Sequence, residues 1–162
     1  MSLGAGLAYA VGGRAELGAA IAAVGAVGTA LMRLPPAVKV PPKGGGIVVS
    51  GASSGIGRAA AEQLAALGYT VFAGVRKLSD GEPLKAAGCV PLVLDVASEA
   101  SVKAAAAEVK RALGKTPLVA IVNNAGVSGA SLPLELETDE NMQFVFNVNV
   151  FGILRMNKWR LT

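Results

Sequence analysis

Residues 46–57 read Gly46-Ile47-Val48-Val49-Ser50-Gly51-Ala52-Ser53-Ser54-Gly55-Ile56-Gly57, and this stretch decides the fold. An apolar run stops at a hydroxyl, turns through three glycines and leads into a segment of helical composition, so it predicts a strand, a tight turn and a helix. Amide groups at the start of a helix are unpaired and carry the positive end of the helix dipole, which stabilises an anion there. The stretch therefore predicts a phosphate-binding turn.

Composition narrows the class of protein. The 162 residues are enough for one ordinary domain, rich in Ala and Gly. The net charge of +4 comes without a Lys/Arg run or an aromatic platform, which argues against a nucleic-acid partner. There is one cysteine, Cys89, and no histidine, which excludes a disulfide framework, histidine metal sites and Ser-His-Asp chemistry. We predict no metal site and expect Cys89 to be a small buried side chain.

Residues 1–45 differ from the rest and form an apolar N-terminal extension. Leu17–Met32 carries no charge, but as a helix it would span only roughly 24 Å of a hydrocarbon core ~30 Å thick. Three interpretations stay open: a membrane anchor, a leader that is cleaved or targets an organelle, and a loosely packed extension of a soluble cytoplasmic protein. If the segment spans a membrane, the positive charges after it place the domain in the cytoplasm. Paired prolines and glycines in residues 34–45 predict a stiff linker.

Strands and helices alternate after the glycine turn. Apolar runs predict strands at Thr70–Val75, Val90–Leu94 and Pro117–Val122, and Pro91 is best tolerated if the third strand of the chain lies at a sheet edge. Ser98 is placed to cap the helix that follows this strand. The alternation predicts an α/β fold, the N-terminal half of a Rossmann-type doubly wound parallel sheet with strand order 3-2-1-4. A ligand would lie over the carboxyl ends of the strands, where four groups collect: Ser50 and Gly51, Arg76, Asp95, and Asn123.

Four motifs follow one another along residues 46–158. They are Ser50-Gly51-x-x-x-Gly55-x-Gly57, Asp95-Val96, Asn123-Asn124-Ala125-Gly126 and Asn147-Val148-Asn149-Val150-Phe151-Gly152. In this order they resemble the classical short-chain dehydrogenase/reductase family. The resemblance implies an NAD(P)-dependent oxidoreductase that acts on a carbonyl or alcohol substrate.

The resemblance also implies a role for each motif. In the family the glycine turn holds the pyrophosphate, the acidic residue after the third strand contacts the adenine, and the Asn-Asn-Ala-Gly segment supports the sheet and the nucleoside. The cofactor-binding candidates are therefore Ser50, Gly51, Ser53, Ser54, Gly55, Ile56, Gly57, Asp95, Val96, Asn123, Ala125 and Gly126. The alternatives are a cap on the following loop for Asp95 and a purely structural role for Asn123.

Charge at the end of the second strand favours NADP over NAD. An NAD site needs a carboxylate there for the ribose hydroxyls, whereas an NADP site has cations for the extra phosphate. No acidic residue stands between Glu62 and Asp80, and Arg76 and Lys77 occupy the place instead. We therefore predict that the cofactor is NADP and that Arg76 binds it; a solvated basic pair is the alternative.

The last predicted helix begins at a Thr138 cap and runs to about Lys158, before a short tail at 159–162. Its middle is apolar nearly all round, so we expect it to be buried against the sheet or a partner subunit. Phe144–Met156 would then pair with a second copy or with a full-length homologue. The resemblance implies that Asn149 helps to hold a water in a proton relay to an active-site lysine.

The other catalytic residues of the family have no counterpart in this sequence. Family members continue with a strand that bears a catalytic serine and a helix that bears Tyr-x-x-x-Lys, whereas Tyr9 and Tyr69 are followed four residues on by Gly13 and Ala73. The tyrosine exchanges a proton with the substrate oxygen, and the lysine lowers its pKa for that purpose. We expect a C-terminally truncated member that is inactive alone. The alternatives are a non-catalytic nucleotide-binding or interaction module and a non-functional fragment of a longer gene product.

Overall fold

The computed structural model describes residues 44–130 and 132–159. Contacts divide the chain into Met1–Lys39 and Val40–Thr162, and all described residues belong to the second unit. The predicted membrane segment Leu17–Met32, nearly all of the predicted linker and the end of the predicted tail lie outside the described residues.

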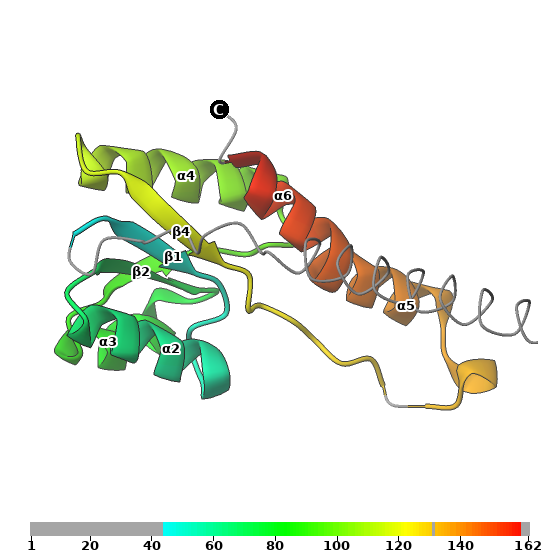
Figure 1. Ribbon diagram of the computed structural model, residues 1–162. Coiled ribbons are helices and arrows are strands. Elements are labelled where there is room, and N and C mark those ends of the chain that lie inside the picture. The colour runs from blue at the N-terminus through cyan, green and yellow to red at the C-terminus, as the bar shows by residue number, and fades with distance from the viewer. Residues whose placement is uncertain (1–43, 131, 160–162) are drawn as a thin grey trace, which may run out of the picture. The chain divides into compact units, whose positions relative to one another are not determined.

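Four parallel strands form one sheet in the order β3-β2-β1-β4, which confirms the predicted Rossmann-type topology (Figure 1). The strands are β1 (Gly46–Val49), β2 (Thr70–Val75), β3 (Val90–Val93) and β4 (Leu118–Val122). In the register, Gly46 lies opposite Thr70 of β2 and Leu118 of β4. Strand β3 ends one residue earlier than predicted and β4 begins one residue later, but Pro91 lies on the edge strand as expected.

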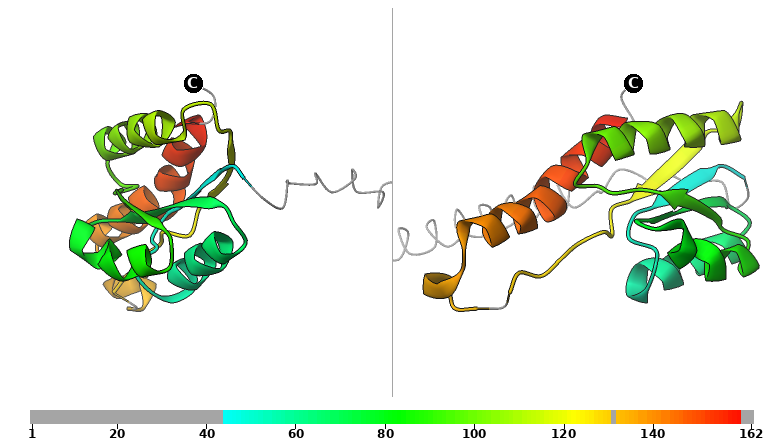
Figure 2. Two further views of the ribbon diagram at one scale, coloured as in Figure 1. Left: turned by 90° about the vertical axis from the view of Figure 1, so that its left-hand side faces the viewer. Right: turned by 180° about the vertical axis from the view of Figure 1, so that it is seen from behind.

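Helices cover both faces of the sheet, as the two further views make clear (Figure 2). One face carries α2 (Gly55–Ala66) and α3 (Glu82–Ala86), which follows the short 3₁₀ helix η1 (Leu78–Gly81). The core on this side consists of Ile47, Val49, Ala52, Ala61, Val71, Ala73, Val75, Leu84 and Cys89, so Cys89 is buried as predicted. The other face carries α4 (Glu99–Leu113) and α6 (Gly152–Trp159), over Val48, Phe72, Leu92, Leu94, Val96, Val102, Ala105, Val109, Leu113, Val148 and Met156.

Local signals fix the ends of the helices. The backbone of Gly68 has φ +91°, the left-handed conformation in which helices commonly end, and α2 stops just before it. Ser98 caps α4, because its hydroxyl oxygen accepts a hydrogen bond from the Ser101 amide at 3.2 Å. Thr138 caps the last helical segment in the same way, since its Oγ1 accepts from the Asn141 amide at 3.2 Å. Both caps are confirmed.

The C-terminal helix is continuous but changes its winding in the middle. It runs through α5 (Asp139–Phe146), the π-helix η3 (Asn147–Phe151) and α6, after a loop that contains the 3₁₀ helix η2 (Leu134–Leu136). Only one side is covered by the sheet and α4, through residues such as Val148 and Met156. Within the described residues the sheet therefore buries one side of this helix, and its burial against a partner subunit stays a prediction. Phe144, Phe146, Val150, Phe151, Ile153 and Leu154 are exposed.

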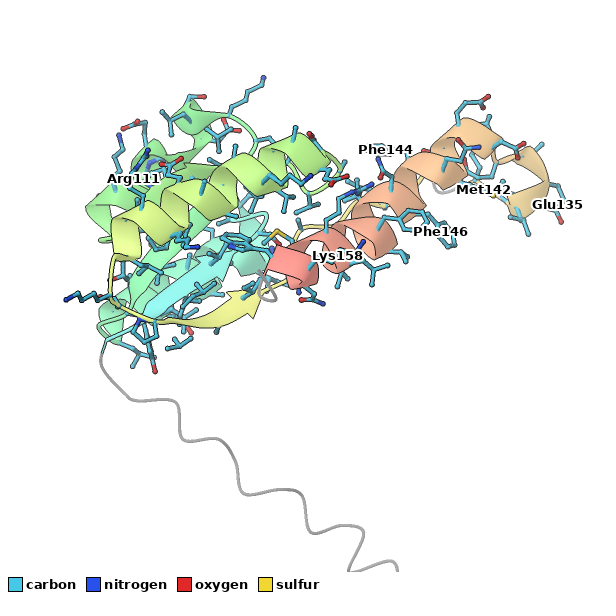
Figure 3. All side chains as sticks on the ribbon, turned by 90° about the horizontal axis from the view of Figure 1, so that it is seen from above. Arg111, Glu135, Met142, Phe144, Phe146 and Lys158 are labelled. Atoms are coloured by element: carbon cyan, nitrogen blue, oxygen red, sulfur yellow. The ribbon has the colours of Figure 1, made fainter. Side chains whose placement is uncertain are left out.

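Part of the C-terminal helix lies beyond the edge of the sheet. Strand β4 is paired with β1 and, within the described residues, with no other strand, and its five residues are all half-buried. Helix α5 extends past the sheet, and Figure 3 shows Phe144 and Phe146 on opposite sides of this helix.

Of the helices in residues 44–130 and 132–159, none has the length and apolarity needed to cross a membrane.

Candidate functional site

The predicted site residues follow the carboxyl ends of the four parallel strands. Ser50 and Gly51 come after β1, Arg76 after β2, Asp95 two residues after β3, and Asn123 after β4. Because the strands are parallel, their carboxyl ends lie at one edge of the sheet. The fold therefore brings all four groups to the same edge.

Ser50 ties the end of β1 to the end of β4. The residue is 1% exposed, and its hydroxyl oxygen accepts hydrogen bonds at 3.0 Å from the amides of Asn124 and Ala125. The hydroxyl itself donates to the Val122 carbonyl at 3.3 Å. One buried hydroxyl thus fixes three backbone groups from the β4 side of the site.

Asn124 makes the matching connection in the opposite direction. Its side-chain Nδ2 donates to the carbonyl oxygens of Ser50 and Gly51, both at 3.0 Å. This residue was not among the predicted cofactor-binding candidates. The signal for it was present, because it stands inside the Asn-Asn-Ala-Gly motif, but nothing local distinguishes its role from that of Asn123.

Two glycines of the turn are needed because the backbone is crowded. Gly51 has φ +66°, and a Cβ added there would lie 2.8 Å from Ala125 Cα. A Cβ on Gly57 would collide with the Asn124 side chain and the Gly51 carbonyl oxygen. These contacts pack the turn against the segment after β4.

The start of α2 has a different environment. Gly55 has φ +56°, and a Cβ added there would have no atom within 4 Å. The N-cap residue Ser54 makes no side-chain capping hydrogen bond, and the first turn of the helix contains no acidic residue. Ser53, Ser54 and Ile56 are exposed, with Ile56 at 83%. An anion could approach these amides without displacing a side chain of the protein.

The basic residues near the turn differ in their partners. Arg76 and Lys77 are exposed directly after β2. Arg58, in the first turns of α2, is paired with Glu62, because its Nε donates to Glu62 Oε1 at 2.8 Å. The positive charge after β2 is therefore the more accessible to a ligand.

Asp95 is held within its own loop. Its Oδ1 accepts a hydrogen bond from the Ala97 amide at 2.9 Å, and its own amide donates to Ser101 Oγ at 2.9 Å. The side chain thus has the loop-capping role that was the alternative to adenine contact. The two roles are compatible, because a carboxylate has several acceptor positions. The neighbouring Val96 is buried.

Asn123 and Asn149 both bind other parts of the chain. Asn123 Nδ2 donates to Asn157 Oδ1 of α6 at 3.2 Å, which supports a structural role. Asn149, in the π-helix, accepts from the Val127 amide at 2.9 Å through Oδ1 and donates to the Val127 carbonyl at 2.8 Å through Nδ2. It therefore fixes the loop that continues from Ala125 and Gly126.

Comparison with known proteins agrees with this geometry. The family model for short chain dehydrogenases matches residues 46–161. The chain belongs to the short-chain dehydrogenase family. The match covers the sheet, the glycine turn and the whole C-terminal helix, which are the parts that build the site.

Individual members of the family show how much of the fold is represented. The chain is 37% identical to mouse retinol dehydrogenase 5, over 65% of this chain and 34% of that protein. It is 39% identical to a 3-oxoacyl-(acyl-carrier-protein) reductase of Pseudomonas aeruginosa, over 68% of this chain and 46% of that protein. The structure of a 3-ketoacyl-(acyl-carrier-protein) reductase from Brucella melitensis, complexed with NADH, matches with a TM-score of 0.68 and 28% identity, over 72% of this chain and 49% of that one. The chain thus spans less than half the length of these short-chain dehydrogenases. Members of the family bind nicotinamide dinucleotides, as that complex illustrates.

Proposed function

We propose that residues 46–158 form the NADP-binding half of a short-chain oxidoreductase that acts on a carbonyl or alcohol. The observation that carries the proposal is the start of α2. The space beside Gly55 is empty, and the first turn of the helix has neither an acidic residue nor a side-chain capping hydrogen bond. A pyrophosphate would supply the negative charge that this helix start lacks. In an oxidoreductase that also has the catalytic residues, the bound dinucleotide would accept or donate the hydride.

Each part of the site has a place in this proposal. The turn from Ser50 to Gly57 would hold the pyrophosphate, with Ser50 and Asn124 keeping the turn in shape. Asp95 and Val96 would contact the adenine, and Asn123, Ala125 and Gly126 would support the nucleoside. Asn149 would support a water in the proton relay while its side chain holds Val127.

The choice of NADP over NAD rests on Arg76 and Lys77. Both side chains are exposed at the end of β2, and no carboxylate stands between Glu62 and Asp80 to accept the ribose hydroxyls. A guanidinium can bind a phosphate through two parallel hydrogen bonds, so Arg76 is the stronger candidate of the two.

Titration calorimetry of the full chain with NADP and with NAD tests this proposal. We expect NADP to bind more tightly than NAD. Arg76→Ala should weaken NADP binding about tenfold and change NAD affinity little, because Arg76 would make a charged hydrogen bond only with the extra phosphate of NADP. Arg111→Ala, in the last turn of α4, is the matched control and should change neither. Equal affinities for the two nucleotides, or a preference for NAD, would contradict the proposal.

We further propose that the 162 residues bind the cofactor without catalysing a reaction. They contain no Tyr-x-x-x-Lys, so they lack the tyrosine and lysine pair that would give a proton to the substrate oxygen. Incubation with NADPH and a panel of ketones and aldehydes should leave the nicotinamide absorbance constant. Substrate-dependent oxidation of NADPH would contradict this part of the proposal. A non-functional fragment would, in addition, fail to bind either nucleotide.

A second candidate function is that of an interaction module. The apolar side chains of Phe144–Met156 support it, since Phe144, Phe146, Phe151 and Leu154 are each about half exposed, at 47%, 57%, 50% and 53%. Exposed apolar area of this kind marks a binding surface for another protein chain. We propose that a second copy or a full-length homologue covers it. Sedimentation analysis tests this: Phe146→Glu should convert the assembly to monomer, and Glu135→Gln should not.

Membrane association is a separate proposal, based on sequence alone. Leu17–Met32 would insert into a membrane and leave the following domain on the cytoplasmic side or, if it is a leader, direct the chain to an organelle. Flotation of the full chain with lipid vesicles tests this, and Val24→Asp should abolish flotation. A full chain that stays in the dense fraction would contradict the proposal and favour a soluble protein.

A further inference from the structure

One helix holds two loops of the candidate site through two different side chains. Asn149 holds Val127, as described above, and Arg155 holds Val96 on the other side of the site. Arg155 Nη1 donates a hydrogen bond to the Val96 carbonyl oxygen at 3.1 Å. No motif in the sequence predicts a role for Arg155.

The same guanidinium fixes the π-helix. Its Nη1 also donates to the Asn147 carbonyl oxygen at 3.1 Å, and its Nη2 donates to Asn147 Oδ1 at 2.7 Å. Asn147 is the first residue of the π-helix, a winding that is rare and often found at functional sites. The donors of a guanidinium lie in one rigid plane, so a single half-buried Arg155 sets the relative positions of three acceptors.

Gly152 brings the helix close enough for this contact. It is buried, and a Cβ added to it would lie 2.9 Å from Val96 Cγ2. The close approach of Gly152 to the Val96 side chain and the hydrogen bond from Arg155 to the Val96 carbonyl hold the same residue at two points. The position of Val96 is therefore set by α6 as well as by its own loop.

We propose that Arg155 is a positioning residue for the adenine end of the dinucleotide site; this inference rests on the proposed function. Arg155 fixes Val96 and, through it, the adjoining Asp95, whose carboxylate is held on the Ala97 amide at 2.9 Å. Without the guanidinium we expect the 94–98 segment to be less ordered. Asp95 would then be less well placed to contact an adenine ring. The pyrophosphate turn is held separately by Ser50 and Asn124, so it keeps its shape.

Binding of half-cofactors to the full chain tests the proposal. Arg155→Met should weaken the binding of ADP, which carries the adenine, about tenfold, because the charged hydrogen bonds that hold Val96 and Asn147 in place are lost. The affinity for nicotinamide mononucleotide should change less than about twofold. Arg155→Lys keeps the charge but not the planar fork, and should fall between. Arg111→Met is the matched control and should bind both ligands normally. Unchanged ADP binding, or an equal loss of both ligands, would overturn the proposal.

Amide hydrogen exchange without ligand separates this proposal from the proposed function. The reporters are the Ala97 amide, bonded to Asp95 Oδ1 at 2.9 Å, and the Ser98 amide, bonded to the Asp95 carbonyl at 3.1 Å. Arg155→Met should speed exchange at these two amides and leave the 50–57 segment unchanged. If the unaltered chain binds neither nucleotide, the proposed function fails and the exchange decides alone: unchanged exchange at Ala97 and Ser98 overturns the role of Arg155.

Discussion

Asn124 donates two hydrogen bonds to Ser50, one from its backbone amide to the hydroxyl and one from its side chain to the carbonyl oxygen, both at 3.0 Å. The two residues are 74 positions apart in the chain. The bonds join the end of β1 to the end of β4 beyond the hydrogen bonds of the sheet itself. The glycine turn and the Asn-Asn-Ala-Gly segment are therefore one structural unit, and changes on either side should affect both.

Ser50→Ala should lower the free energy of unfolding by about 1–3 kcal/mol, because it leaves the amides of Asn124 and Ala125 without their common acceptor. Urea denaturation followed by circular dichroism measures the change. Ser53→Ala, at an exposed position of the same turn, is the control and should have little effect. Equal stability of the Ser50 variant and the unaltered chain would show that the hydroxyl is not needed.

Gly57→Ala should destabilise the chain by overpacking rather than by loss of a bond. The new methyl group would meet the Asn124 side chain and the Gly51 carbonyl, which is expected to cost about 1–3 kcal/mol. Gly126→Ala is the comparison, since its methyl group would come no closer than 3.4 Å to Asn149 Oδ1. The two variants should differ clearly in denaturation midpoint. Similar midpoints would mean that the turn relaxes around the added methyl group.

Asn149→Ala removes both hydrogen bonds to Val127 and should cost about 2 kcal/mol, because two backbone groups lose their partner. Asn149→Asp keeps an acceptor for the Val127 amide but turns a carboxylate toward the Val127 carbonyl, so it should not restore stability. Asn157→Ala breaks a single exposed contact with Asn123 and should change stability by less than about 0.5 kcal/mol. Full stability of the aspartate variant would rule out the donor role of Nδ2.

Cys89 should make the chain less stable at alkaline pH. Burial raises the pKa of its thiol above the ordinary 9.0, and the charge of Glu62 raises it further. The unfolded chain therefore loses the thiol proton at a lower pH than the folded chain. The free energy of unfolding is unaffected below the unfolded pKa and falls as the pH rises through the folded pKa. Denaturation midpoints above neutral pH should fall more steeply for the unaltered chain than for Cys89→Ala, whereas parallel pH profiles would contradict this.

The topology was predictable because few arrangements satisfy the pattern. The sequence has four apolar runs joined by helices. If the crossovers between parallel strands are right-handed, the order expected for the first half of a doubly wound sheet is the observed β3-β2-β1-β4. Caps at Ser98 and Thr138 and the edge position of Pro91 follow from the chemistry of single residues. Signals of this kind act over a few residues and can be read locally.

Contacts between distant residues were not predictable in the same way. The bonds of Asn124 to Ser50 and of Arg155 to Val96 join residues 74 and 59 positions apart, and no local pattern encodes them. The π-helix at Asn147–Phe151 likewise has no sequence signature, because its stretch resembles an ordinary apolar helix. The sequence also does not say whether the sheet or another chain covers Phe146, because helical periodicity identifies apolar faces but not what packs against them.

The long sequence separation between Ser50 and Asn124 has a consequence for the order of folding. Strands β1 and β2 are near in sequence and can pair early, whereas β4 must close a much longer loop before it reaches β1. In this order of folding, the carbonyl oxygens of Ser50 and Gly51 would acquire their partner, Asn124, only when β4 docks. The chain should therefore be able to bind the dinucleotide only after β4 has docked. A bound dinucleotide should in turn slow the dissociation of β4 from the native sheet.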